Sequence, residues 1–287
     1  MRGRVPRRSA GAALRSRVGA VAVVVPAHDE QELLPGCLHS VSRALRRVPA
    51  GVRTGVFVVA DRCADGTEAR ALSCAAEFDE FALLVNSAPL QLGGVRNLGA
   101  GGAFRALSAH APGRVWLLHT DADTTVPADW AREHLRHAEG GTHAVAGRAM
   151  IRRWSGPAAP ARYRYEALVA EHVHAGGHHH VYGANLGVRA DVFAALGGFP
   201  AVATGEDHAL WRRIVEAGWV TGQPNELVVF TSDRTRGRAH GGLAAFLHEL
   251  SGRDRPAGVV EPGTAFGPPG GGQHWGHAPV FRTGPDR

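Results

Sequence analysis

The sequence predicts an α/β fold with a mostly parallel sheet and helices on both of its faces. Three observations support this prediction: short apolar, β-branched segments alternate with amphipathic segments, the apolar segments are continuous, and acidic residues follow several of them. Strands that are covered on both faces have such continuous apolar runs. Their alternation with helical patterns favours parallel connections between neighbouring strands.

The first half of the chain shows this alternation most clearly. Residues 20–25 are alanine and valine only, which is typical of a strand buried on both faces. Leucine and valine then recur three and four residues apart from Leu34 to Val48, which predicts a helix. The same reasoning predicts further strands over residues 55–60, 81–85 and 115–118, and helices over 66–76 and 94–109.

The second half has a less regular pattern and no internal repeat. It predicts a strand within residues 142–150, a helix over 160–175, a loop and strand over 181–188, a short helix over 191–196, a helix over 207–217 and a strand over 226–230.

The two ends of the chain differ from this core in composition. Residues 1–17 contain six arginines and no apolar pattern, so we expect a disordered basic tail. Residues 251–287 are rich in glycine and proline, so we expect a flexible tail there as well. The folded domain is therefore expected over residues 18–250.

The net charge of the chain indicates which classes of molecule it could bind. The net charge is +6, and all 32 basic residues are arginine. Such a balance fits nucleic acids, membrane surfaces or anionic small substrates. The chain has no zinc-finger spacing and no basic run interleaved with aromatic residues, so we expect no nucleic-acid partner. Peripheral contact with a membrane through the arginine-rich N-terminus is also compatible with this charge.

The number of cysteines and the length of the apolar segments indicate the cellular compartment in which the protein is expected. Cys37, Cys63 and Cys74 are odd in number and lack CxxC spacing, which argues against a disulfide framework or a zinc site and favours a reducing compartment. No segment approaches the roughly 20 apolar residues that a transmembrane helix needs. The apolar run after the basic start is short and ends in Pro-Ala-His-Asp-Glu, unlike a signal peptide. We therefore expect a cytoplasmic protein.

Acidic residues follow the first, second and fourth predicted strands: Asp29 with Glu30, then Asp61, then Asp121 with Asp123. Ligands of open parallel sheets bind beyond the carboxyl ends of the strands. Two carboxylates one residue apart can bind a hard divalent cation, which can bridge phosphate oxygens. An Asp-x-Asp sequence alone is also a common turn, and its position after a buried strand is what favours a site.

Six motifs, in order over about residues 20–240, resemble those of family 2 glycosyltransferases. They are Val24-Val25-Pro26-Ala27-His28-Asp29-Glu30, Asp61-Arg62-Cys63-Ala64-Asp65-Gly66-Thr67, Gly93-Gly94-Val95-Arg96-Asn97-Leu98-Gly99, Asp121-Ala122-Asp123, Gly183-Ala184-Asn185 and Gly205-Glu206-Asp207. The resemblance implies a GT-A fold, with a Rossmann-like sheet and a smaller acceptor-side region. It also implies transfer of a sugar from a nucleotide diphosphate.

The chain departs from the family pattern in places. His28-Asp29 replaces the common Tyr-Asn, and Cys63 replaces a serine, which puts the details of base recognition in doubt. The Gln-x-x-Arg-Trp motif of processive members is absent, which favours a single transfer.

The resemblance, with the chemistry of the residues, assigns roles. We expect the donor nucleotide, a UDP- or GDP-sugar, to be bound by Pro26, Ala27, His28, Glu30, Asp61, Arg96, Asp121 and Ala122. We expect Mn²⁺ or Mg²⁺ to be held by Asp123 and His240, the diphosphate by Arg234, Arg236 and Arg238, and an unknown acceptor by Gly183, Ala184 and Asn185. Asp207 is expected to be the base of an inverting reaction, with Glu206 orienting it or the acceptor.

Several of these residues also have a purely structural interpretation. Asp61, Asp65 and Glu30 could cap the helices that follow them, and Glu206 with Asp207 could simply open a helix, where the dipole favours negative charge. The arginines could form an exposed basic loop. Adjacent histidines in a strand point to opposite faces, so His178, His179 and His180 are expected to line the acceptor pocket rather than to share one metal ion.

Other functions stay open at this point. A retaining GT-A transferase would give an α-linked product, and a degenerate GT-A domain would bind without turnover. A sugar nucleotidyltransferase would have a Gly-x-Gly-Thr-Arg loop after the first strand, and a Rossmann oxidoreductase would have Gly-x-Gly-x-x-Gly there. The chain has Pro-Ala-His-Asp-Glu at that position instead.

Overall fold

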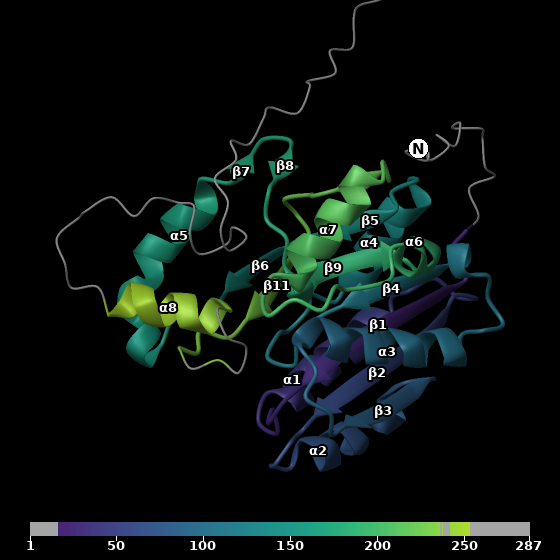
Figure 1. The fold of residues 1–287 in the computed structure, drawn as a ribbon, viewed down its shortest axis with the longest axis horizontal. Coiled ribbons are helices and arrows are strands. Elements are labelled where there is room, and N and C mark those ends of the chain that lie inside the picture. Colours follow the sequence, from purple (N-terminus) through teal and green to yellow (C-terminus); the bar gives the residue numbers. More distant parts are fainter. Residues whose placement is uncertain (1–16, 236, 238–241, 253–287) are drawn as a thin grey trace, which may run out of the picture.

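The computed structural model describes residues 17–235, 237 and 242–252. Its centre is a seven-stranded sheet in the order β10-β5-β9-β4-β1-β2-β3 (Figure 1). Only β9 runs antiparallel to its neighbours, β4 and β5, among the strands of this sheet. The strands are β1 Ala20–Ala27, β2 Arg53–Asp61, β3 Phe81–Asn86, β4 Val115–His119, β5 Ala144–Ala146, β9 Leu186–Arg189 and β10 Thr221–Gly222.

Helices cover both faces of the sheet, as the sequence predicted. The helices α1 (Leu34–Leu45), α2 (Thr67–Ser73) and α4 (Trp130–Glu139) bury their apolar side chains on one face. The helices α3 (Leu92–Ala106), α6 (Ala190–Ala195) and α7 (Glu206–Glu216) cover the other. Strand β1 contributes to both layers because its side chains alternate between the faces: its odd-numbered valines join the first core, and Ala20 and Ala22 join the second.

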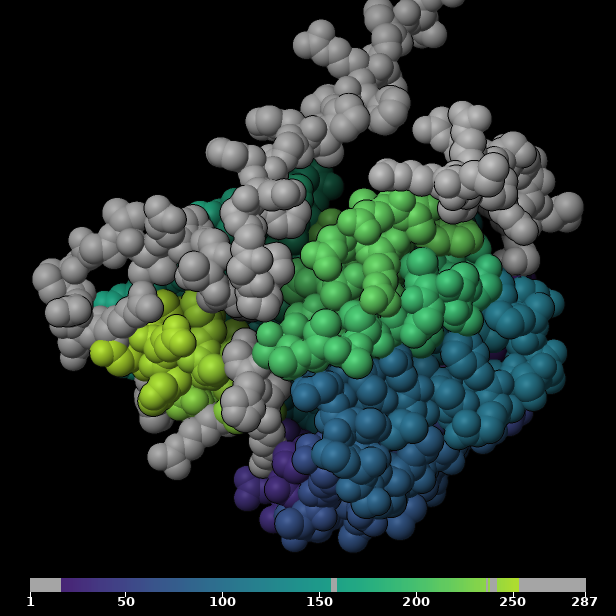
Figure 2. Space-filling view, viewed as in Figure 1, coloured from purple at the N-terminus to yellow at the C-terminus, as the bar shows by residue number. Residues whose placement is uncertain are grey.

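A smaller region extends from one end of the sheet, at the left of Figure 1. Strand β6 (Arg148–Ile151) pairs in parallel with β11 (Val228–Thr231), and β7 (Val173–His174) pairs with β8 (Gly177–His178). The helices α5 (Arg162–Ala170) and α8 (Leu243–Ser251) share a separate apolar cluster with Ile151. In Figure 2, α8, in yellow, lies at the edge of the body formed by the blue and green segments.

Short 3-10 helices complete the described elements. They are η1 Ala75–Glu77, η2 Pro112–Arg114, η3 Gly156–Ala161 and η4 Gly183–Asn185. In the part of the chain that the structure describes, no helix has the length and apolar character that crossing a bilayer requires.

The structure differs from the sequence-based expectation at several elements. Helix α8 and the short strands β7, β8 and β10 were not predicted, and the helix expected over residues 160–175 is the shorter α5. The single strand expected over residues 142–150 is two strands, β5 and β6, which belong to different sheets and are separated by Gly147. A Cβ atom on Gly147 would lie 2.2 Å from Asn185 Nδ2 and 2.6 Å from Leu227 O, so the chain here packs directly against the Asn185 side chain and the Leu227 backbone. Helix α4 was not predicted, because its apolar stripe is narrow and most of its residues are charged or polar.

Candidate active site

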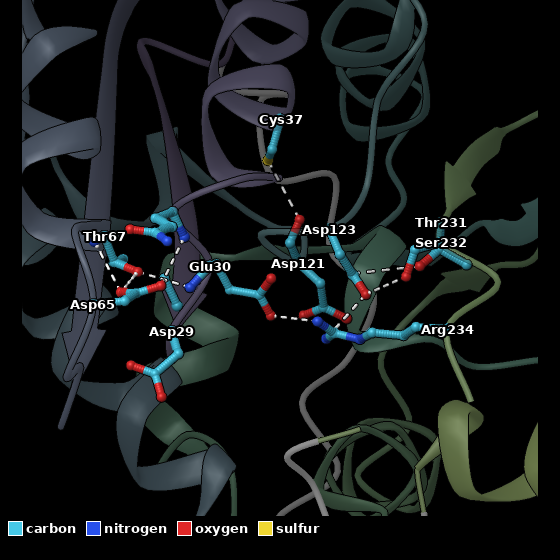
Figure 3. Close-up of polar contacts among 12 residues, drawn as sticks. Asp29, Glu30, Cys37, Asp65, Thr67, Asp121, Asp123, Thr231, Ser232 and Arg234 are labelled. Carbon is cyan, nitrogen blue, oxygen red and sulfur yellow. Dashed lines mark hydrogen bonds and ion pairs between the residues drawn. The ribbon is translucent and has the colours of Figure 1, made fainter. Parts of the chain in front are cut away.

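The carboxyl ends of β4, β1 and β2 lie side by side, because these three strands are neighbours and parallel. The loops that follow them place Asp121 and Asp123, Glu30, and Asp61 along one edge of the sheet. A fourth segment, which follows β11, brings Arg234 to the same edge (Figure 3). The predicted convergence of acidic residues at the strand ends is therefore present, and an arginine from the distant end of the chain joins it.

Arg234 connects two of these carboxylates. Its guanidinium lies 3.0 Å from Asp123 Oδ2 and donates a 2.7 Å hydrogen bond to Glu30 Oε1 (Figure 3). Ser232 Oγ also donates to Asp123 Oδ2, at 2.8 Å. Burial raises the pKa of Asp123, and the nearby Arg234 charge counteracts part of that rise. Asp123 is thus a mostly buried anion that relies on a cation beside it.

A second chain of charges runs from the Asp-x-Asp sequence to α7. Arg96, on α3, is 1% exposed and donates a 2.6 Å hydrogen bond to Asp121 Oδ1. On its other side its Nε lies 3.4 Å from Glu206 Oε1. Burial opposes the charge on Arg96, but the carboxylates around it keep its pKa above the ordinary value. Arg96 is therefore an internal charge and not part of a solvated helix face.

Asp207 is held by backbone amides at the start of α7. The N–H of Gly183 donates to Asp207 Oδ2 at 2.7 Å, and the N–H of His208 donates to Oδ1 at 2.8 Å. Gly205, just before the helix, has φ +72°, a left-handed conformation that glycine adopts without strain. Burial, and then the Asp207 charge, raise the pKa of the neighbouring Glu206. Two acids thus stand at a helix N-terminus, with Asp207 fixed in orientation.

Asp61 is 7% exposed at the end of β2 and accepts a 2.6 Å hydrogen bond from Asn86 Nδ2 at the end of β3. The His28 ring contacts the Asp61 carbonyl oxygen. Asp29 and Arg62 both have positive φ, 52° and 49°, which is uncommon for residues other than glycine and concentrates at functional sites. The tips of the first two loops are therefore tightly shaped around Asp61.

Glu30 and Asp65 could each have capped the helix that follows, and the structure assigns them different roles. Asp65 accepts hydrogen bonds from the N–H of Thr67, at 2.9 Å, and of Gln31, at 3.1 Å, so it organises the start of α2 and ties the two loops together. The Glu30 side chain reaches Arg234 instead of capping a helix. Both residues line a cavity of about 430 Å³ that also includes Asp29, Gln31, Ala64 and Arg234.

Three residues at the site were not singled out from the sequence. Asn86 binds Asp61, Ser232 binds Asp123, and the Cys37 thiol lies 3.3 Å from the backbone oxygen of Asp121. Asn86 could have been found, because it directly follows the third predicted strand at the same sheet edge. Ser232 and Cys37 are placed only by tertiary contacts.

Some predicted site residues have side chains that face the interior. Pro26 and Ala27 end the buried strand β1, and Ala122 packs into the core beneath α1 and α4, so these residues offer a ligand their backbone at most. The Asn185 side chain is fully buried: it donates to the backbone oxygens of Arg148 and Leu227 and accepts from Trp130 and His134. The expectation that the Asn185 side chain contacts an acceptor is therefore not supported by its placement, since all its polar atoms are already used.

The remaining predictions concern the arginines after β11, His240 and the run of three histidines. Arg236, Arg238 and His240 lie outside the described residues. His178 is buried and accepts a hydrogen bond from the His180 N–H, while His180 Nε2 contacts the Val169 carbonyl oxygen and His180 Nδ1 contacts the Tyr182 hydroxyl. Within the described residues, these histidines are not among the groups arranged to share one metal ion.

The donor atoms at Asp121 and Asp123 suit a hard divalent cation. Both residues offer carboxylate oxygens, which Mg²⁺ and Mn²⁺ prefer. The Arg234 guanidinium lies against Asp123 and already compensates its charge, so a positive group is accepted there. Asp121 keeps a side chain that is 35% exposed. A cation could therefore bind both residues once Arg234 moves from Asp123.

A family profile described as Glycosyl transferase family 2 matches residues 22–197 of the chain, more than half of its length. The chain belongs to glycosyl transferase family 2. Membership confirms the family resemblance and places the protein among the glycosyltransferases. Five of the six motifs lie within the matched range, and Gly205-Glu206-Asp207 follows it. A search of curated proteins finds no significant match.

Solved structures confirm the GT-A fold of this family 2 member. The mannosyltransferase PcManGT from Pyrobaculum calidifontis, in complex with GDP-Man and Mn²⁺, superposes with a TM-score of 0.57 at 20% identity, over 77% of this chain and 58% of that one. TarS 1–349 from S. aureus, in complex with UDP-GlcNAc, gives 0.55 at 14% identity, over 76% and 60%. The chain thus spans about three-fifths of the length of each of these transferases.

Proposed function

We propose that this family 2 protein transfers a sugar from a nucleotide-diphosphate donor to an acceptor hydroxyl. The observation that carries the proposal is the continuous chain of charges from Asp121 through Arg96 to Glu206, next to Asp207. It joins the expected diphosphate anchor to the expected base across the sheet edge. The transferases with similar structures bind GDP-Man and UDP-GlcNAc, which supports a UDP- or GDP-sugar as donor here.

The donor nucleotide fits the cavity between the first two loops. Glu30 lines this cavity and Asp61 lies at the start of the second loop, and both can accept hydrogen bonds from the base or ribose. The strained loop tips around Asp29 and Arg62 hold these groups in place. Arg234, at the rim of the cavity, can turn from the carboxylates to the diphosphate, because a guanidinium fork matches phosphate oxygens. Arg236 and Arg238 remain predicted contributors to the same role.

Asp123, with Asp121, would hold the divalent cation, and His240 remains a predicted additional ligand. The cation would stabilise negative charge on the departing diphosphate. The Mn²⁺ in the PcManGT complex supports this assignment. The protein's own contribution is to keep two carboxylates at the strand end while Arg96 fixes one oxygen of Asp121.

Asp207 is the proposed base. The acceptor oxygen attacks the anomeric carbon from the face opposite the diphosphate, and the bond between that carbon and the diphosphate oxygen breaks. The bonding electrons leave with the diphosphate, and the acceptor proton passes to Asp207. The two amides that hold Asp207 fix its orientation for this transfer. This geometry supports an inverting reaction, and the absence of the processive motif supports a single transfer.

The test separates donor binding from transfer. Donor binding to the full chain is measured by thermal shift with UDP- and GDP-sugars, with and without Mn²⁺, and turnover is measured as release of UDP or GDP. Asp123→Ala is expected to abolish the Mn²⁺-dependent shift. Asp207→Asn is expected to keep the shift and to lower turnover at least 100-fold, the typical effect of losing a general base.

Asp79→Asn is the matched control, because Asp79 lies before β3 at the opposite edge of the sheet and contacts Thr54. Near-normal turnover in Asp207→Asn would disprove the base assignment. An α-linked product would show a retaining reaction. Donor binding without turnover would favour a degenerate binding module, and absence of both binding and turnover with every donor would overturn the proposal.

A further inference from the structure

Three side chains with metal-binding atoms lie together between α1 and η1, outside the site described above. They are His39 on α1, Cys74 directly after α2, and Glu77 in η1. One ligand atom of each residue lies within 4.8 Å of the ligand atoms of the other two. His39 Nδ1 and Glu77 Oε1 are only 2.5 Å apart. A thiol, an imidazole nitrogen and a carboxylate oxygen therefore converge here from two helical segments.

Backbone contacts hold these two segments in place without a metal ion. Helix α1 packs against α2, and Ser42 Oγ, about one turn after His39, donates to the Glu77 carbonyl oxygen at 3.5 Å. The Glu77 N–H donates to the Cys74 carbonyl oxygen at 3.1 Å, which fixes the separation of these two residues along η1. An ion would thus enter a largely preformed group of ligands, and little ordering of the chain would oppose its binding.

The three residues differ in exposure in a way that admits an ion from solvent. The side chains of His39 and Glu77 are 59% and 26% exposed, whereas Cys74 is 3% exposed. An ion can therefore approach from the surface, where His39 and Glu77 lie, and reach the sulfur atom at the edge of the core. Water remains available on the outer side for a further coordination position.

The ligand atoms of His39 and Glu77 are not committed to the fold. Within the part of the chain that the structure describes, their side chains form no ion pair or hydrogen bond except the one with each other. Burial raises the pKa of the Cys74 thiol, and Ser73 counteracts part of that rise. An ion that binds here must therefore displace the thiol proton. Divalent ions that prefer sulfur, such as zinc, do so.

A second group with similar spacing, Asp29, Cys63 and Asp65, lies in the first two loops of the active site. Its carboxylates already have a structural task. Asp29 Oδ1 accepts a 2.6 Å hydrogen bond from the Ala64 N–H, and Asp65 Oδ1 accepts one of 2.9 Å from the Thr67 N–H. An ion would have to compete with these backbone donors, so the group at α1 and η1 is the better site for a metal.

We infer that His39, Cys74 and Glu77 form a zinc site, with water as the fourth ligand. Zinc takes sulfur, imidazole nitrogen and carboxylate oxygen at about 2.0–2.3 Å in tetrahedral geometry, which places the ligand atoms about 3.2–3.8 Å apart. Small rotations of the three side chains give that spacing. The sulfur and nitrogen atoms select zinc over Mg²⁺ and Mn²⁺, which prefer oxygen ligands. The inference is independent of the cation proposed at Asp121 and Asp123.

The zinc ion would link α1 to the segment that follows α2. These two helices come after the loops that carry Glu30 and Asp61, so the ion would hold together the elements from which those loops extend. Unfolding separates the three ligands along the chain. Zinc therefore binds the folded protein better than the unfolded one, and it should raise the stability of the fold.

The experiment titrates the full chain with Co²⁺, in a phosphine reductant and an excess of Mg²⁺. Cobalt has the same ligand preferences as zinc, and its bond to a thiolate gives a charge-transfer absorption band in the near ultraviolet that oxygen ligands do not give. We expect this band to appear, and Zn²⁺ to abolish it by displacing Co²⁺, because zinc binds such sites more tightly. Zn²⁺ should also raise the unfolding temperature of the protein.

Three variants test the ligands one at a time. Cys74→Ser should abolish the cobalt–thiolate band. His39→Gln and Glu77→Gln should each weaken Zn²⁺ binding about tenfold or more, since loss of even an indirect partner of a metal ligand has effects of that size. His39 is exposed, so His39→Gln should unfold in urea without metal as the unchanged protein does, and it keeps the test valid if Cys74→Ser fails to fold.

Two matched variants serve as controls. His248→Gln changes an exposed histidine on α8, and Cys63→Ser changes the cysteine of the loop group. Both should keep the band and the Zn²⁺ affinity of the unchanged protein. The inference is overturned if no band appears with excess Co²⁺, if Cys74→Ser keeps it, or if Cys63→Ser loses it. It also fails if His39→Gln and Glu77→Gln both bind Zn²⁺ normally. Donor binding and turnover are measured separately, so none of these results would count against the transferase proposal.

Discussion

At the residue scale, Arg96 and Gly183 depend on each other. A Cβ atom at position 183 would lie 2.5 Å from the Arg96 guanidinium. Glycine is needed there because the arginine fills the space where a side chain would be, and in that position it contacts both Asp121 and Glu206. The Gly-Ala-Asn sequence thus serves the site through the small size of its first residue, while its asparagine serves the interior.

Arg234 is expected to have opposite effects on the two ligands of the site. In Arg234→Ala, Mn²⁺ alone should bind more tightly, because a competing cation has left Asp123. The donor should bind more weakly, by roughly tenfold, because a charge-assisted contact to phosphate is lost. Calorimetric titration with Mn²⁺ and with donor tests both effects. The exposed Arg47→Ala is the control, and equal weakening of both ligands would contradict the competition.

His134 makes stability depend on pH. Burial lowers its pKa to about 3, whereas an unfolded histidine titrates near 6.5. Between pH 3 and pH 6.5 His134 is protonated in the unfolded chain and neutral in the folded one. The stability that neutral His134 contributes is therefore complete above about pH 6.5 and is lost as the pH falls toward 3. The slope is about 1.4 kcal/mol per pH unit for one proton. Urea unfolding at several pH values should show it, and His134→Gln should reduce the slope by about one proton.

At the element scale, the close packing of α3 on the sheet places Arg96. A Cβ atom on Gly99 would lie 2.4 Å from Val24 Cγ1 and 3.0 Å from Val59 Cγ2, so the helix contacts β1 and β2 almost through its backbone. The sequence predicted this helix but not its distance from the sheet. That distance follows from the glycines on its inner face, which look unfavourable when helix propensity alone is considered.

Two alanine substitutions in α3 should therefore have opposite signs. Gly99→Ala is expected to destabilise the fold by about 1–3 kcal/mol, because it overpacks the contact with β1. Gly101→Ala, whose Cβ would meet only Arg105 at 3.7 Å, is expected to stabilise it by up to about 1 kcal/mol. Chemical denaturation measures both. If the two variants shift the unfolding midpoint in the same direction, the packing explanation fails.

At the scale of the whole molecule, Asn185 joins the central sheet to the smaller region. Its side chain bonds α4, β6 and the residue before β11 at once. Asn185→Ala leaves several buried groups unsatisfied, at about 1–3 kcal/mol each, so we expect a loss of at least about 3 kcal/mol by urea unfolding. Asn225→Ala removes one hydrogen bond, to His174 O, from a more exposed position and should cost less than about 1 kcal/mol.

The sequence by itself determined the fold class, the family and the edge of the sheet where charged residues gather. Continuous apolar strands and the motifs at their ends are local features, so Asp61, Asp121 and Asp123 could be placed at strand ends from order alone. The same reasoning could not place Asn185, because a motif residue can serve either a ligand or the interior.

Only the tertiary structure decided which distant residues meet. Arg234 and Glu30 are 204 positions apart in the chain, and Arg96 and Glu206 are 110 apart, yet each pair is joined by a hydrogen bond. Strands β5 and β6 belong to different sheets, although the sequence predicted a single strand on both sides of Gly147. Such contacts depend on how elements pack, which local periodicity does not encode, and they determine where the charges of this site lie.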